Sequence, residues 1–476
     1  MHKFLVHSLY PIRSQNNFCL SECASSVFIR RGARCMNKAV HTKETTGRLI
    51  ATCLLSTILA ACSGGSGGEL VQDQDEVAEA SALTAIGADT ADGCTVADIN
   101  QWIDERMRDT YIFYDRVPVL DLSTYDDPQE LVRDLRVFPD IYSSLGDKAQ
   151  DEALISNSNV TRFGFSLRVA SDGRQHFSSI SGNSPMEGAG IQRGDELVAI
   201  NSIAIDDITD EQWLEFIVGE SDKELTAVFT VKSGASEATD FIVTKTTYTE
   251  STVPVFGTYE QTNNEVGYMQ VTAFRGTTAD EIDTAVQFLA EAGISELILD
   301  LRYNGGGFTA VARQLASQIA GPPHVDEVYS RRTFNDKFSE FDRDFFIEPQ
   351  ALNLELSRLM VLTTARTASA SETLVNGLSP LIDVVVIGAL TEGKPFTSVA
   401  QDFCGRRLHA MSTLTTNGAD ESVLGGLIPT CEVEDDFLAP ADSISDALTG
   451  AAFNYIQFGA CPNVQSKLVQ LENRSG

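Results

Sequence analysis

The stretch from 358 to 396 constrains the fold more than any other part of the chain. An apolar run over 359–362 predicts a buried strand, and a helical segment of about three turns ends at Leu378. Small and hydroxyl residues over 363–371 separate the two, and the β-branched run 384–387 predicts a second strand. The first strand therefore delivers a serine-rich turn to a helix N-terminus, and the second returns the chain beside it.

Ser369 and Lys394 are the candidate catalytic residues of this unit. Ser369 would lie at the helix N-terminus, where the helix dipole favours a developing alkoxide, and Lys394 follows the second strand in a glycine turn. A lysine is a base only when it is neutral, and apolar surroundings lower its pKa. The neighbouring Pro395 and Phe396 suit such burial. The pattern predicts a hydroxyl nucleophile beside an amine base.

The same serine also fits a purely structural role. Ser369-Ala-Ser-Glu372 matches a capping box, in which the two side chains bond reciprocally to the first-turn amides. A Ser–His–Asp triad is disfavoured, because the chain after residue 62 has three histidines and no Gly-x-Ser-x-Gly elbow; they are His176, His324 and His409. The sequence Gly388–Lys394 fits a phosphate-binding loop, but Pro395 stands where Ser or Thr would bind the metal.

A second signal is a triple glycine, Gly305 to Gly307, between a predicted buried strand over 296–301 and a helix over 310–319. Glycines allow backbone amides to converge on one point without interference from Cβ atoms. We expect the oxyanion hole to combine the amide of Ala370 with that of Gly305 or Gly306.

Residues 161–247 change to short alternating strands. The segment 184–201, with its Ala-Gly-Ile helix, Arg-Gly-Asp turn and strand ending in Ile-Asn, resembles a PDZ domain. The resemblance implies a groove that accepts an extended peptide by strand addition. The implied peptide-binding residues are Phe163, Gly164 and Phe165, with Gly164 in the carboxylate-binding loop.

Three motifs in order, 300–307, 367–372 and 393–394, resemble those of the C-terminal processing (tail-specific) serine peptidases. The resemblance implies a Ser–Lys dyad on a crotonase-like α/β core of ββα units, with an N-terminal helical cap and a PDZ-like domain. It implies an endopeptidase that captures unfolded or tailed proteins through the PDZ domain and cleaves them. The alternative is a catalytically decayed lipoprotein that binds peptide tails as an adaptor.

The chain departs from this family where the lysine would be oriented. Family members often have an acid eleven residues after the nucleophile, where this chain has Pro380, and a glutamine four after the lysine, where it has Ser398. Ser398 and the nearby Gln401 are the candidate orienting residues. No metal-ligand pattern such as His-Glu-x-x-His occurs, so we expect no metal and no cofactor.

The N-terminus predicts export. The uncharged run 49–61 follows a basic flank and ends in Leu-Ala-Ala-Cys62, which resembles a bacterial lipobox. A run this short is typical of a signal peptide rather than a membrane span. We expect lipidation of Cys62 and a place in the bacterial cell envelope, anchored to the outer membrane and facing the periplasm. Met36 is a second candidate start, which would remove residues 1–35.

Four cysteines remain after the leader and Cys62, an even number that predicts disulfides in an exported protein. Three pairings are possible, and the favoured one joins Cys404 to Cys431 and Cys94 to Cys461. The first would close one loop, and the second would tie the two ends of the chain together.

The net charge limits the classes of partner, and the length allows several domains. The 476 residues carry 35 basic and 67 acidic side chains, a net charge of -32, which opposes nucleic acid and anionic membrane surfaces as partners. We expect protein or peptide substrates, with membrane contact only through the lipid. The expected segments are a leader (1–62), a flexible linker (63–92), a helical cap (93–150), a PDZ-like domain (151–250), a peptidase core (251–462) and a tail (463–476). Within the cap, Thr95 with Asp98 predicts the start of one helix, and a second is expected over 128–145.

Overall fold

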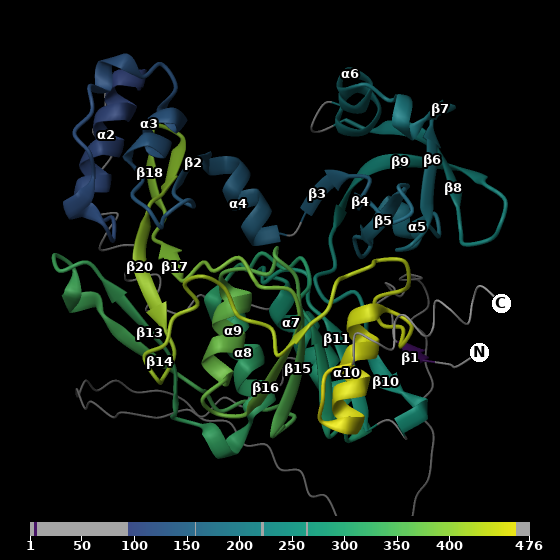
Figure 1. The fold of residues 1–476 in the computed structure, drawn as a ribbon. Coiled ribbons are helices and arrows are strands. Elements are labelled where there is room, and N and C mark those ends of the chain that lie inside the picture. The colour runs from purple at the N-terminus through teal and green to yellow at the C-terminus, as the bar shows by residue number, and fades with distance from the viewer. Residues whose placement is uncertain (1–3, 7–93, 158, 220–222, 263–264, 463–476) are drawn as a thin grey trace, which may run out of the picture. The chain divides into compact units, whose positions relative to one another are not determined.

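The computed structural model describes residues 4–6, 94–157, 159–219, 223–262 and 265–462 (Figure 1). Apart from the short strand β1 (Phe4–Val6), the predicted leader with Cys62, the linker 63–92 and the tail 463–476 lie outside the described residues. None of the helices in the described part of the chain is both long enough and apolar enough to cross a membrane.

A mixed sheet in the order β1-β10-β11-β12-β15-β16-β21 forms the core. Its strands from β11 to β21 pair in parallel, and β10 pairs antiparallel with β1 and β11. The interiors of the central strands β12 and β15 are apolar because helices cover both faces of the sheet. The bounds are β10 (Phe256–Tyr259), β11 (Val266–Gln270), β12 (Glu296–Asp300), β15 (Arg358–Thr363), β16 (Asp383–Gly388) and β21 (Cys431–Glu432).

Helices α7 (Thr278–Ala292), α8 (Thr309–Ala320) and α9 (Ala370–Leu378) pack on one face of this sheet, and α10 (Ala447–Phe458) packs on the other. The helix–strand order confirms the predicted α/β core, including both strands and the helix of the stretch that contains Ser369. Because β12 and β15 are neighbours in parallel, the loops that follow them meet at one edge of the sheet.

Two smaller antiparallel sheets join the core. One has the order β14-β13-β20-β17, and the other has the order β18-β19-β2. Their bounds are β13 (Val328–Phe334), β14 (Arg343–Phe346), β17 (Phe396–Ser398), β20 (Met411–Thr416), β2 (Ser144–Asp147), β18 (Gln401–Phe403) and β19 (Arg406–His409). The chain that leaves Lys394 therefore enters β17 directly.

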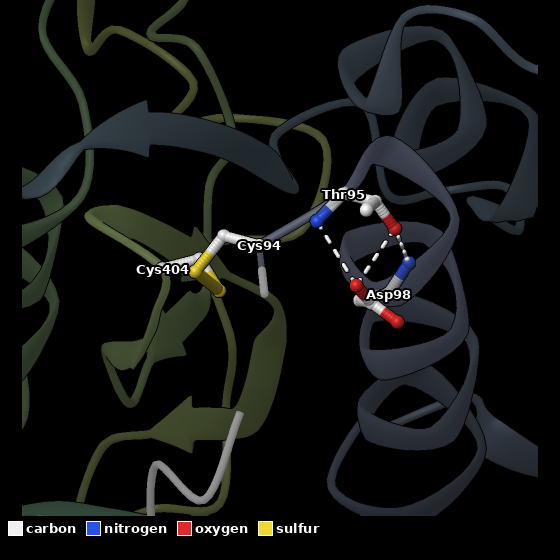
Figure 2. Close-up of a disulfide and its surroundings, with 4 residues drawn as sticks. All are labelled: Cys94, Thr95, Asp98 and Cys404. Atoms are coloured by element: carbon white, nitrogen blue, oxygen red, sulfur yellow. Dashed lines mark hydrogen bonds between the residues drawn. A yellow bond between two sulfur atoms is a disulfide. The ribbon is translucent and has the colours of Figure 1, made fainter. Parts of the chain in front are cut away.

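The first predicted helix of the cap begins where expected, and the second ends earlier than expected. Helix α2 (Val96–Asp109) starts at a capping box in which Thr95 accepts from the Asp98 amide and Asp98 from the Thr95 amide (Figure 2). The second helix was expected over 128–145, but α3 (Pro128–Leu135) stops after two turns. Pro139 cannot continue a helix, and the chain then pairs as β2 with β19 before α4 (Lys148–Asn157).

Residues 159–249 form a separate sheet in the order β3-β9-β8-β6-β5-β4, with β7 paired to β6. Its strands enclose their own apolar cluster around Phe177 and Phe229. Strand β4 lies at one edge of this sheet. The bounds are β3 (Asn159–Arg162), β4 (Phe165–Val169), β5 (Gln175–Ile180), α5 (Pro185–Gly188), β6 (Glu196–Ile200), β7 (Ile203–Ala204), α6 (Asp210–Trp213), β8 (Leu225–Lys232) and β9 (Thr239–Thr249).

Candidate active site

Ser369 stands at the junction between β15 and α9 in a conformation that few residues adopt. It is the N-cap of α9, its φ is 56° and its ψ is -118°, and its carbonyl accepts the first helical bond from the Thr373 amide at 2.8 Å. A non-glycine residue in the left-handed region stores backbone strain, which structures keep mostly at functional positions. The strain is held by neighbours, since the Ala368 amide and the Ser371 hydroxyl both donate to the Asn304 carbonyl, at 3.0 and 3.1 Å.

The buried carboxylate of Glu372 joins the serine turn to the lysine turn. Its Oε2 accepts from the amides of Ser369 at 2.8 Å and Lys394 at 2.9 Å. Its Oε1 accepts from the Gly393 amide at 2.7 Å and the Thr391 hydroxyl at 2.5 Å. Because one oxygen takes both amides, the Ser369 and Lys394 backbones lie within two hydrogen-bond lengths of each other.

The predicted capping box is therefore present, and it does not compete with a catalytic role. The glutamate that caps the helix also holds the turn that carries the lysine. Sequence reasoning found this residue only as a helix cap. The capping-box spacing was the signal for it, but nothing local to Glu372 indicates its other three partners.

The Lys394 side chain is half-buried. Its Nζ lies 5.3 Å from the centre of the Tyr142 ring, which comes from the cap. Burial lowers the pKa of the Lys394 ammonium, while the carboxylates of Asp140, Glu372 and Glu392 act in the opposite direction. Among the described residues Nζ makes no hydrogen bond, so Ser369 Oγ and Lys394 Nζ are not hydrogen-bonded to each other. Hydrogen bonds between catalytic side chains are often long or poorly aligned before substrate binds.

The two residues expected to orient Lys394 do not contact it. Ser398 Oγ lies 3.4 Å from the His409 Nδ1 atom, and Gln401 Nε2 donates to the Thr110 hydroxyl at 2.8 Å. The prediction was wrong because β17 carries the chain away from the site into another sheet. The groups that face Lys394 are instead Glu372 on its backbone and Tyr142 over its amine.

The glycine loop lies against the nucleophile. A Cβ atom on Gly306, whose φ is 104°, would lie 2.8 Å from Ser369 Cβ and 2.9 Å from the Ala370 nitrogen, so only glycine fits. The Gly306 amide already donates to Asn304 Oδ1 at 2.9 Å, which removes it as an oxyanion donor. The amides of Gly305 and Ala370 have no acceptor within the described part of the chain. Of the predicted set, these two remain available.

A buried ion cluster anchors the start of this loop. The guanidinium of Arg302 bonds Asp300 and Asp446, each at 2.9 Å, and Asp435 at 3.3 Å. Arg193, from the Arg-Gly-Asp turn of the sheet domain, bonds the same Asp435 at 2.6 Å and Asp446 at 3.1 Å. The cluster thus connects three distant segments of the chain beside the glycine loop.

Of the predicted peptide-binding residues, Phe165 begins strand β4, and Phe163 and Gly164 come directly before it. Gly164 has a φ of 91°, and a Cβ there would lie 2.2 Å from Ser184 Cβ, so this position also requires glycine. Phe163 is buried in the domain core, which leaves it no exposed surface for a ligand. Phe165 opens the edge strand and packs against Trp213 of α6, at 6.3 Å between ring centres.

The structure pairs the cysteines differently from the favoured prediction. Two disulfides form, but they join Cys94 to Cys404 (Figure 2) and Cys431 to Cys461. Cys404 lies between β18 and β19, which pack on α2, whereas Cys431 belongs to β21 of the central sheet. These placements separate the two residues that were expected to pair. Within the described ranges no group of His, Cys, Asp and Glu side chains could hold a metal ion.

Three family descriptions match this chain. Residues 265–432 match "Peptidase family S41", residues 98–148 match "Peptidase S41 N-terminal domain", and residues 153–227 match "PDZ domain". Among solved structures, a Bacteroides fragilis protein described as "Putative S41 protease" superposes with a TM-score of 0.63 and 23% identity. The match covers 75% of this chain and 97% of that one, and it establishes a likeness of fold.

Curated relatives carry related names. The carboxyl-terminal-processing protease of Picosynechococcus is 28% identical over 213 residues, which is 44% of this chain and 48% of the relative. The carboxy-terminal processing protease CtpA of Bacillus subtilis is 25% identical over 268 residues, 56% of this chain and 54% of the relative. The chain spans about half the length of these two relatives.

Proposed function

The chain belongs to peptidase family S41, whose members are serine-type peptidases, and from this premise we propose that it is an endopeptidase that cleaves unfolded or tailed proteins with a Ser369–Lys394 dyad. The observation that carries the proposal is the shared acceptor: one oxygen of Glu372 holds the backbones of both residues. A glutamate that only caps the helix would need the bond from the Ser369 amide but not the bond from the Lys394 amide.

The chemistry follows from the surroundings of each group. Neutral Lys394 takes the proton of the Ser369 hydroxyl as Oγ attacks the scissile carbonyl, and the amides of Gly305 and Ala370 stabilise the oxyanion. The lysine returns the proton to the leaving amine, which departs with the C-terminal fragment. The neutral Lys394 amine then takes a proton from water as the water attacks the acyl-enzyme, and it returns that proton to Ser369 Oγ as the N-terminal fragment leaves with a new carboxylate.

Substrate capture is assigned to the PDZ domain. Strand β4 is the edge strand of its sheet, so an extended peptide can pair with it through main-chain hydrogen bonds. The glycine at position 164 precedes that edge, where a free C-terminal carboxylate would be received. Lipidation of Cys62 would hold the protein in the bacterial cell envelope, at the outer membrane facing the periplasm.

One observation favours a second function. The side chains of the dyad are not hydrogen-bonded in the structure, and the predicted orienting residues lie elsewhere. A decayed peptidase that only binds peptide tails through its PDZ domain would have these properties. The two functions differ in whether Ser369 is needed for turnover or only for stability.

Replacement of the nucleophile separates these functions. We expect Ser369→Ala to lower the rate of cleavage of an unfolded tailed protein by on the order of 10⁴ or more. As an N-cap alone, the same change would cost about 1 kcal/mol of stability and leave any cleavage intact. Lys394→Arg keeps the charge but cannot deprotonate, so it should be equally inactive. Product mapping by mass spectrometry measures the cleavage, and thermal unfolding measures the stability.

The matched control is Ser379→Ala, which changes a serine at the other end of the same helix. It should leave cleavage unchanged. A Lys394→Arg protein that cleaves near the wild-type rate would overturn the dyad, and a wild-type protein that binds tails without cleaving them would establish the adaptor.

A further inference from the structure

The amine of Lys394 faces the helical cap. Its Nζ atom makes no hydrogen bond within the described ranges, and Ser398 and Gln401, which were expected to orient it, bond elsewhere. The side chain that it meets is Tyr142, in the cap segment between α3 and β2. A base acts only when its amine is held at the right distance and angle, so this contact bears directly on catalysis.

Tyr142 touches the lysine turn at two points. Its ring centre lies 5.3 Å from Nζ, and its hydroxyl donates a long hydrogen bond, at 3.5 Å, to the Glu392 carbonyl. Burial raises the pKa of the Tyr142 phenol to about 12, so the ring stays uncharged while the lysine titrates. A cation within about 6 Å of an aromatic ring centre is attracted by the negative face of the ring. A neutral amine gains little from that face, so the contact favours the ammonium form of the lysine.

Asp140 is a second cap residue that acts on the same amine. The residue is 3% exposed, and its carboxylate has no ion pair in the part of the chain that the structure describes. Burial lowers the pKa of the lysine ammonium, and the carboxylates of Asp140, Glu372 and Glu392 act in the opposite direction. Asp140 has the largest effect of the three. A buried carboxylate without a cation is unfavourable, so its environment improves when a positive charge forms nearby.

Hydrogen bonds fix the cap loop that carries both residues. The Asp140 carboxylate accepts from the Tyr142 amide at 2.7 Å and from the Tyr111 hydroxyl at 2.8 Å. It also accepts from the amide and the hydroxyl of Ser143, at 3.0 and 2.5 Å. The Ser143 hydroxyl accepts in turn from the amide of Met411, at 3.1 Å. Met411 begins β20, which pairs with β17, so the loop is held against the strand that follows the lysine turn.

We propose that Tyr142 and Asp140 are positioning residues of the dyad, which hold the Lys394 amine and stabilise the ammonium that forms when it takes the proton of the serine hydroxyl. The proposal rests on the proposed peptidase function and adds to it that the helical cap completes the catalytic site. Both residues favour the charged amine, so their contribution grows as the proton moves, and interactions of this kind lower the barrier. The cap thereby takes the place of the orienting residues that were expected at positions 398 and 401.

The test is the pH profile of kcat/KM for an unfolded tailed protein, measured on the full-chain protein and its variants. Tyr142→Leu removes the ring, and Asp140→Asn removes the charge. Each change destabilises the ammonium and so lowers the pKa of Lys394, and the midpoint of the profile should move towards lower pH. Above the midpoint the lysine is neutral in every variant. There kcat/KM should still be about tenfold lower than in the wild type, because the forming ammonium has lost its support.

Two matched variants separate this role from a structural one. Tyr142→Phe keeps the ring and should keep the wild-type midpoint and plateau, because the hydroxyl that it removes makes only the long bond to Glu392. Tyr125→Leu changes another half-buried tyrosine of the cap, whose hydroxyl donates to Asp134 at 3.0 Å. It should lower thermal stability and leave the midpoint in place. An unmoved midpoint in Tyr142→Leu, whatever its rate, or an equal movement in Tyr125→Leu, overturns the proposal.

A direct titration of Lys394 keeps failure of the peptidase function distinct. Lysines isotope-labelled at Cε are followed by NMR in the full-chain protein, and the Lys394 signal is assigned by its loss in Lys394→Arg. If no substrate is cleaved, the peptidase function fails, and the positioning role is still upheld by a Lys394 titration that moves to lower pH in Tyr142→Leu and Asp140→Asn. Titrations that coincide with the wild type overturn it. Asp140→Asn also loses hydrogen bonds within the cap, so Tyr142→Leu decides if that variant does not fold.

Discussion

Two buried polar clusters support the candidate active site, and they are built in opposite ways. Glu372 receives its four hydrogen bonds from groups 3 to 22 residues away in the sequence, three of them backbone amides. The cluster of Arg302 joins charged side chains, and its bonds to Asp435 and Asp446 cross 133 and 144 residues. The first holds the serine and lysine turns, and the second holds the glycine loop against the C-terminal segment and Arg193.

The difference indicates that the two clusters have different roles: one positions the catalytic turns, and the other contributes to the stability of the fold. A carboxylate bonded to neutral donors fixes the geometry of the backbone around it, because each amide has one direction in which it can donate. A buried network of ion pairs has a large desolvation cost and depends on all its members. We therefore expect changes at Glu372 to affect catalysis most and changes at Arg302 to affect stability most.

The largest effect within this comparison is expected from Glu372→Gln. The amide side chain replaces an acceptor with an NH₂ group that faces donors, so the turns of Ser369 and Lys394 should shift apart. A misplacement of this kind should lower kcat/KM by on the order of 10²-fold or more. The control is Glu392→Gln, which changes an exposed carboxylate in the same loop and should not lower kcat/KM. Steady-state kinetics that give Glu372→Gln near wild-type activity would contradict the positioning role.

Arg302→Met should act on the other cluster. The change leaves Asp300 and Asp446 buried without their main cation, which should lower the free energy of unfolding by about 3–5 kcal/mol. Below the melting transition, the folded fraction should keep much of its activity. Arg193→Met is the matched variant, and its loss should be smaller because Arg302 still neutralises Asp446. Denaturant unfolding measures both, and equal losses would contradict the ranking.

The smallest effect concerns the pH dependence of cleavage. Only the neutral amine of Lys394 accepts the serine proton, so kcat/KM should rise with pH and reach half its plateau below the usual pKa of a lysine. The Glu392 carboxylate favours the ammonium form, so Glu392→Gln should move this midpoint towards lower pH. The movement should shrink at high salt, because Glu392 is exposed. A midpoint that moves towards higher pH would show that Lys394 is not the titrating base.

The sequence by itself determined those parts of the protein that depend on local pattern. Alternating and apolar runs marked the strands and helices around Ser369, because backbone geometry responds to neighbours a few residues away. The same locality revealed the strand-to-helix turn, the lysine after the next strand and the glycine loop. Glycine is needed where this loop lies against another backbone, as the close approach of Gly306 to Ser369 and of Gly307 to Phe274 shows.

Only the tertiary structure decided what lies beside these elements. Cys94 and Cys404 are 310 residues apart, and an even count of cysteines leaves three pairings that local pattern cannot distinguish. The contacts of Tyr142 with Lys394 and of Arg193 with Asp446 likewise arise from how separate elements pack. Local pattern specifies each element but carries little information about such contacts, because they depend on how whole sheets and helices dock.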